Sequence, residues 1–175
     1  MNMKPQDVLV TLKLLASGWP GSYAAMGMQI GLSASETHAA FRRARQAGLI
    51  HPKDNVPIKS AVAEFLLHGL KYTFPGRPGP RTRGMPTIHA APPLADEFRS
   101  SSSPNEDIPV WPDPEGTQRG YEFKPLCRSA PLAARNDAML YEWLVLADAL
   151  RGGRAREREI ASAIVRKRFQ YENHD

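Results

Sequence analysis

SASETHAAFRRARQAGLI, at residues 33–50, is the stretch that decides the fold. Ser33 and Glu36 have the spacing of a capping box, which starts a helix by satisfying two free backbone N–H groups. Gly48 lies where a helix commonly ends in a left-handed residue. The apolar pair that follows is expected to begin a strand. The sequence therefore predicts a helix over residues 33–47 with a strand just beyond it.

The predicted helix has two different faces. At about 100° per residue, one side collects small and aromatic residues, namely Thr37, Ala40, Phe41, Ala44 and Gly48. The opposite side is polar and cationic, with Ser35, His38, Ala39, Arg42 and Gln46 on it and with Arg43 and Arg45 at its margins. The first face predicts packing against neighbouring helices, and the second predicts a surface for a polyanion.

Two helices are expected before this one and a small β wing after it. Pro5 suits the first turn of a helix over residues 5–16. Ser22 and Gly31 suit the start and the end of a second helix over residues 22–30. Residues 49–51 and 56–58 are expected to pair as the wing, with Lys53 at its tip. A further helix over 60–71 and a brief strand over 72–74 complete this part.

The pattern over residues 4–74 resembles bacterial winged helix-turn-helix transcriptional regulators, MarR-like in the broad sense. The resemblance is carried by SASETH at 33–38 and by FRRARQAGLI at 41–50. It implies that helix 33–47 lies in the major groove of double-stranded DNA. Together with the polar face, it gives the candidate DNA-binding residues Ser33, Ser35, His38, Arg42, Arg43, Arg45, Gln46 and Lys53. Residues 75–131 do not resemble the helical linkers of these regulators.

Charge supports the same interpretation. The net charge is +5 and the isoelectric point is about 9.6. Residues 1–75 hold eight Lys and Arg against four Asp and Glu, whereas the rest of the chain is nearly balanced. A local basic excess indicates a polyanionic partner better than a global one.

The middle of the chain is rich in proline. Residues 75–131 hold 12 of the 16 prolines, so an irregular, extended segment with a mobile loop near 99–107 is expected. Arg77, Arg81 and Arg83 are either a basic arm that lies along DNA or charges on an ordinary surface loop.

Two helices are expected at the C-terminus, over 137–150 and 155–171. Their apolar side chains are candidates for contacts with a partner or a second copy of the chain, and they are Leu140, Trp143, Leu144, Ile160 and Ile164. The expected fold class is thus mainly α: a winged helix domain over 1–74, a Pro-rich irregular segment over 75–131 and a C-terminal helical pair over 132–175.

Other classes find little support. The sequence has no phosphate-binding glycine loop, no His-Glu-x-x-His and no pair of cysteines for zinc, so no enzyme, metal or cofactor is expected. The chain has a single cysteine, Cys127, and the sequence shows neither a signal peptide nor a membrane span. These features predict a cytoplasmic protein.

The expected function is a sequence-specific DNA-binding regulator, a repressor that acts as a homodimer. The alternatives are an accessory protein of replication, plasmids or mobile elements, and an antitoxin-like or defence-associated protein. In the first alternative the winged helix and the Pro-rich segment bind a protein partner, or the winged helix binds DNA without sequence preference. In the second the C-terminal half binds a partner protein.

Overall fold

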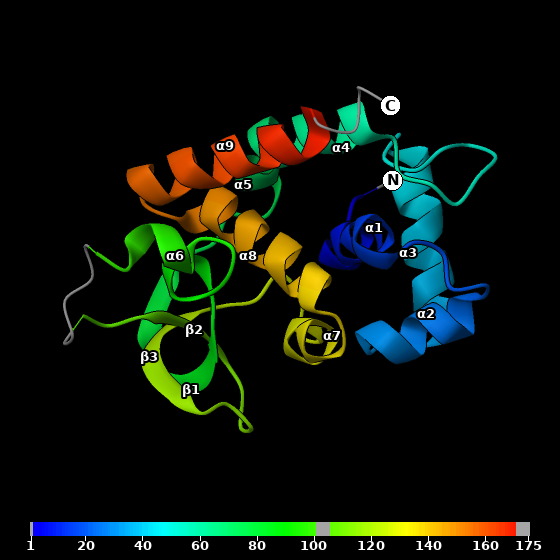
Figure 1. The fold of residues 1–175 in the computed structure, drawn as a ribbon. Coiled ribbons are helices and arrows are strands. Elements are labelled where there is room, and N and C mark those ends of the chain that lie inside the picture. Colours follow the sequence, from blue (N-terminus) through cyan, green and yellow to red (C-terminus); the bar gives the residue numbers. More distant parts are fainter. Residues whose placement is uncertain (1, 101–105, 171–175) are drawn as a thin grey trace. The chain divides into compact units, whose positions relative to one another are not determined.

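The computed structural model describes residues 2–100 and 106–170, and this part of the chain is mainly helical with one small three-stranded sheet (Figure 1). The expectation of a mainly helical chain is confirmed at that level. Part of the loop expected near 99–107, residues 101–105, and the end of the last expected helix lie outside the described residues.

The chain forms two compact units. The first unit comprises Met1–Phe65 and Leu126–Leu144, and the second comprises Leu66–Pro125 and Val145–Asp175. Each unit combines two separate parts of the chain, whereas the sequence predicts three consecutive segments. The three-segment division stays a prediction.

The first unit begins with three helices: α1 (Pro5–Ser17), α2 (Tyr23–Ile30) and α3 (Ala34–Gln46) (Figure 1). The starts of α2 and α3 are confirmed, because Ser22 caps α2 and Ser33 forms the capping box with Glu36. Gly48 has a φ of 84°, the left-handed conformation expected after α3. The caps explain why each helix begins where it does.

The core of the first unit is built from apolar side chains of all three helices. Fully buried members include Leu9, Leu12, Met26, Ile30 and Phe41. The packed face of α3 is the expected one, because Thr37, Ala40, Phe41 and Ala44 are all buried. Burying each large side chain contributes about 1.5–3 kcal/mol. This packing fixes which side of α3 faces solvent.

The β wing expected over residues 49–58 is not formed as two strands. The two expected strands are reduced to one antiparallel bridge between Ile50 and Pro57. Its backbone hydrogen bonds run from His51 N to Val56 O at 2.9 Å and from Ile58 N to Leu49 O at 2.8 Å. Ile50 and Pro57 form the non-hydrogen-bonded pair between these two bonds, so the bridge needs no N–H from Pro57.

Helix α7 (Ala130–Asn136) also belongs to the first unit and was not expected. Pro131 lies at the start of this helix, where the missing N–H of proline costs nothing. The sequence interpretation took that proline as the end of an irregular segment. The expected C-terminal helical pair is therefore corrected to three helices, α7, α8 (Ala138–Gly152) and α9 (Ala155–Gln170).

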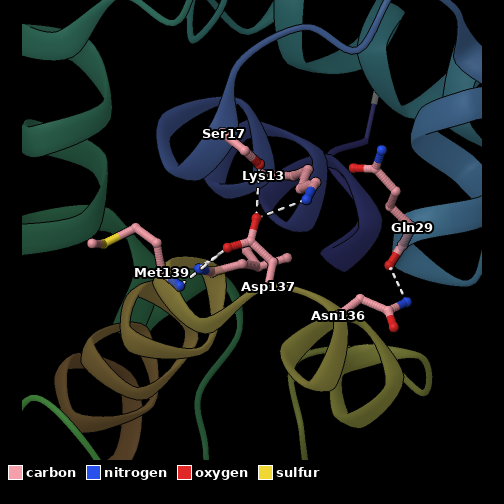
Figure 2. Close-up of polar contacts among 7 residues, drawn as sticks. Lys13, Ser17, Gln29, Asn136, Asp137 and Met139 are labelled. Carbon is pink, nitrogen blue, oxygen red and sulfur yellow. Dashed lines mark hydrogen bonds and ion pairs between the residues drawn. The ribbon is translucent and has the colours of Figure 1, made fainter.

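Asp137 joins the end of α7 to helix α1 (Figure 2). One carboxylate oxygen accepts hydrogen bonds from Lys13 Nζ and Ser17 Oγ, both at 2.7 Å. The other accepts from the backbone N–H groups of Met139 and Leu140 and caps α8. Partial burial alone would raise the pKa of Asp137, but these donors outweigh it and hold the pKa below the ordinary value of 3.8.

We expect Asp137→Asn to lower the free energy of unfolding by about 2 kcal/mol at pH 7, because the charge-assisted bond to Lys13 is lost. A lowered pKa means that the carboxylate stabilises the fold above pH 3.8, and this stability is lost as the pH falls through the pKa of the folded state. The difference between wild type and Asp137→Asn should therefore persist above pH 3.8 and shrink as the pH falls further below that value. Urea unfolding at several pH values measures it, and a constant difference would contradict the assignment.

A continuous helical run crosses the expected boundary of the N-terminal domain. It consists of α4 (Lys59–Glu64), a π-helical turn (Phe65–Gly69) and α5 (Leu70–Thr73). The brief strand expected over 72–74 is therefore wrong. Buried apolar residues at helical spacing, Val62, Leu66 and Leu70, hold the run in place.

The sheet of the second unit is a closed, three-stranded barrel (Figure 1). Strand β1 (Pro78–Pro86) pairs antiparallel with β2 (Pro109–Pro112) and with β3 (Gln118–Phe123), and β2 pairs in parallel with β3. A Cβ at Gly84 would lie 1.7 Å from Trp111 O, and one at Gly120 would lie 1.8 Å from Ile108 O. Glycine at these two positions is what lets the strands close.

The irregular Pro-rich middle segment is thus corrected to a folded barrel. Pro78 and Pro86 are the ends of β1, and Pro109 and Pro112 are the ends of β2. Pro80 lies where the register of β1 shifts. The ends of a strand and a shift in its register tolerate a residue that lacks an N–H. These prolines therefore lie at positions where they do not prevent the sheet from forming.

A buried polar cluster holds the second unit together. Asp148 of α8 accepts hydrogen bonds from Thr87 Oγ1 at 2.6 Å, Trp111 Nε1 at 2.7 Å and Arg151 Nε at 2.9 Å. Arg151 also donates to the carbonyl oxygens of Phe74 and Lys124. Burial raises the pKa of Asp148, and Arg151 and the other two donors oppose that rise.

The apolar residues expected to meet a partner are mostly used inside the chain. Leu140, Trp143 and Leu144 are buried, with at most 6% exposure. Ile160 and Ile164 keep part of their surface exposed. As a correction, the three buried side chains offer no surface to a second protein, because the fold of the chain itself already covers them.

Candidate nucleic-acid interface

The exposed face of α3 contains the centre of the predicted interface. Ser35, His38, Arg42 and Gln46 are all exposed, and they recur at helical spacing along one side of the helix. Arg42 and Gln46 form no hydrogen bond or ion pair with another described residue. Their donors are therefore available to a ligand. Arginine and glutamine are side chains that bind base edges bidentately.

Ser33 has a structural role at the start of this face. Its hydroxyl accepts a hydrogen bond from Glu36 N at 3.0 Å, and Glu36 accepts one from Ser33 N at 2.8 Å. These bonds hold the pKa of the Glu36 carboxyl below its usual value. The cap fixes the first turn of α3, and Ser35 and His38 extend from that turn and the next.

Arg43 is turned toward the protein. Its guanidinium forms an ion pair with the Asp7 carboxylate of α1, with distances of 2.8–3.0 Å. Asp7 is fully buried and also accepts a hydrogen bond from Lys4 N at 2.8 Å. Arg43 therefore fastens α3 to α1, and its donors on this side are occupied.

Arg45 is turned toward the wing. It donates to His51 O at 3.0 Å, to Asn55 Oδ1 at 2.9 Å and to Asp54 O at 3.3 Å. Its guanidinium also lies 5.4 Å from the centre of the Phe41 ring. The residue fastens the turn after α3 to the helix. The two arginines at the margins of the face thus hold it in place, and Arg42 stays at its centre.

Lys53 is exposed in the turn of the wing, where its backbone N–H donates to His51 Nδ1 at 3.3 Å. Asp54 lies 3.5 Å from the same His51 nitrogen. The acidic neighbour reduces the positive charge of the turn. The turn therefore carries both the positive charge of Lys53 and the negative charge of Asp54.

An aromatic contact that the sequence did not reveal borders the face. The ring of Tyr23, at the start of α2, lies 4.7 Å from the ring of His38. Tyr23 also contacts Trp19 and Phe41 edge to face, at 5.1 Å and 5.4 Å between ring centres. This cluster orients His38. Only the pairing of α2 with α3 brings Tyr23 there, since 15 positions separate the two residues in the sequence.

The second unit also contains a buried histidine–carboxylate pair. His89 Nδ1 lies 2.6 Å from Glu157 Oε2, and Glu157 Oε1 accepts from Arg154 N at 2.7 Å. Burial would raise the pKa of Glu157, but these hydrogen bonds outweigh it and lower the pKa. The pair ties α9 to the chain near β1. No group of three or more His, Cys, Asp or Glu in the described part of the chain is placed to hold a metal ion.

Comparison with models of protein families, with curated proteins and with solved structures gave no significant match. Among the helices in the described ranges, none has the length and the apolar character that crossing a membrane requires.

Proposed function

We propose that the first unit is a winged helix-turn-helix that binds double-stranded DNA, with α3 in the major groove. The turn between α2 and α3 is three residues long, Gly31–Ser33, which is typical of helix-turn-helix motifs. The observation that carries the proposal is the exposed face of α3. Arg42 and Gln46 at its centre form no hydrogen bond or ion pair with another described residue. Arg43 and Arg45 at its margins bind other parts of the first unit and hold the face in position.

Each part of the face has a role in this proposal. Arg42 binds a base edge, with guanine as the favoured partner, and Gln46 binds an adenine or a phosphate. Ser35 and His38, nearer the start of α3, contact bases or the backbone in the same groove. Arg43 and Arg45 act as positioning residues. Lys53 contributes a phosphate contact from the turn.

The proposed protein is a transcriptional regulator that acts in the cytoplasm as a homodimer. Doubling the interface gives the specificity that one small domain lacks. Of the residues expected to form the contact between subunits, only Ile160 and Ile164 keep surface for it.

Arg42→Ala is expected to weaken binding to the cognate site by about 1–3 kcal/mol and to relax its sequence preference at one position. The site is first obtained by selecting bound duplexes from a random pool. Affinities are then measured by fluorescence anisotropy in the presence of competitor DNA. Arg158→Ala is the matched control, because Arg158 is also exposed and lies on α9.

The selection and the titration each test the proposal. A pool that shows no enriched sequence contradicts specific recognition. Equal affinities for wild type and Arg42→Ala remove Arg42 from the interface. A decrease for Arg42→Ala alone, with Arg158→Ala unchanged, supports α3 as the helix that contacts DNA.

A further inference from the structure

The barrel of the second unit carries two arginines directly opposite each other. Arg83 of β1 and Arg119 of β3 are partners in the antiparallel register. Directly opposite residues lie on the same face of a sheet, with Cβ atoms about 4.5–5.5 Å apart. Both side chains are exposed. Like charges in this arrangement destabilise a sheet, so the pair costs the fold stability.

The charges of this pair are not neutralised by direct ion pairs within the described ranges. Arg83 and Arg119 form no ion pair with another described residue. Arg81, two residues earlier on β1, differs because it pairs with Asp107. The positive charge is thus concentrated at one end of the β1–β3 face, and its ten guanidinium donors are available to an external anion.

We propose that the Arg83–Arg119 pair binds the sugar-phosphate backbone of a nucleic acid, at an interface separate from the exposed face of α3. Guanidinium groups bind phosphate oxygens bidentately, and two of them side by side match an anion whose charges repeat at short intervals. A bound phosphate also removes the repulsion between the arginines. The contact reads no bases, because it involves the backbone alone.

The surroundings favour a nucleic acid over an acidic protein. Protein interfaces depend on apolar or aromatic anchors that become buried. The large hydrophobic side chains that the described structure exposes are Met28, Val56, Tyr72, Leu132 and Met139, and none belongs to the three strands. Contacts with phosphates need only charge and hydrogen-bond donors, and this face provides both.

The test compares Arg83→Gln/Arg119→Gln with wild type on a duplex of random sequence, over a series of salt concentrations. If each arginine neutralises one phosphate, the slope of log K against log salt should fall by about 2 in magnitude. Arg158→Gln/Arg166→Gln is the matched control, because it removes two exposed arginines of α9 and changes the net charge equally. The control should keep the wild-type slope. Equal slopes for all three proteins would overturn the proposal.

Arg119→Glu gives a second, independent readout. It places opposite charges across the strands, so the protein should melt at a higher temperature and yet bind the random duplex more weakly. Stronger or unchanged DNA binding by this variant would contradict the proposal. Polyglutamate tests the alternative of an acidic protein partner. If polyglutamate binds wild type but not the Arg83→Gln/Arg119→Gln variant, and the slope of log K against log salt for DNA is the same in both, the partner is an acidic protein and the proposal is wrong.

These outcomes are separable from those of the α3 proposal. A random duplex reports the backbone contact, whereas the selected site and Arg42→Ala report recognition by α3. If the selection enriches no sequence but the Arg83→Gln/Arg119→Gln variant lowers the salt slope, the barrel proposal stands and the α3 proposal is wrong. If the selection enriches a site but the slope does not change, the α3 proposal stands and the barrel proposal is wrong.

Discussion

Asp148→Ala is expected to destabilise the second unit by about 3–5 kcal/mol, the largest effect among the substitutions considered for this chain. The side chain of Asp148 is 1% exposed, and that of Arg151 is 5% exposed. Removing the carboxylate leaves a buried guanidinium without its counter-charge. It also leaves the Thr87 hydroxyl and the Trp111 indole N–H without their acceptor.

The effect should be concentrated where Asp148 makes its contacts. Hydrogen exchange is expected to accelerate in β1, β2 and β3, because Trp111 belongs to β2 and Thr87 directly follows β1. Asp96→Ala is the control, since Asp96 is exposed and its loss should change stability by less than about 0.5 kcal/mol. If Asp148→Ala does not fold, Thr87→Val removes one donor alone and should cost about 1 kcal/mol. Exchange in the three strands equal to that of Asp96→Ala would contradict the role of Asp148.

Arg43→Ala is expected to lower the free energy of unfolding by about 3 kcal/mol. It leaves the fully buried Asp7 carboxylate without its ion-pair partner. The expected cost is at the lower end for a buried pair, because the side chain of Arg43 keeps 21% of its surface exposed. Arg42→Ala, at the preceding residue, should change stability by less than about 0.5 kcal/mol.

A double-mutant cycle measures this coupling. Asp7→Ala/Arg43→Ala should cost less than the two single substitutions added together, by about 1 kcal/mol or more, because the second change removes the orphaned charge. Additive costs would show that the ion pair contributes nothing. In DNA titrations of fully folded protein, Arg43→Ala should weaken binding less than Arg42→Ala. The reverse order would assign the direct contact to Arg43.

These predictions separate what two neighbouring arginines do. Helical spacing in the sequence puts Arg42, Arg43 and Arg45 on or beside one polar face, and it predicts a DNA contact for all three. Helical periodicity gives the direction of a side chain from the helix axis but not the identity of the group it meets. The partner of Arg43 is 36 residues away in α1, and Arg45 meets backbone groups of a turn whose path depends on the Ile50–Pro57 bridge.

The same limit explains the errors in the rest of the chain. The prolines of residues 75–131 predict an irregular segment, because proline cannot donate to a sheet. Whether that matters depends on which positions face a neighbouring strand, and the sequence alone does not contain this information. Likewise Pro131, a helix breaker by composition, lies in the first turn of α7. Local composition therefore predicts the wrong structure for the barrel, where pairing with distant residues decides the outcome, whereas the start of α7 follows the local tolerance of proline in a first helical turn.

The sequence by itself determined the helices that start and end through contacts within four residues. Ser22 and the Ser33–Glu36 box start α2 and α3, and Gly48 follows α3, because capping depends on local backbone groups. The tertiary structure alone decided which arginines bind other protein groups and how the prolines fit into the strands of a barrel. It also placed Asp137 and Asp148 where distant donors converge. The physical reason is range: caps and periodicity act within a few residues, whereas ion pairs, strand pairing and burial join groups that only folding brings together.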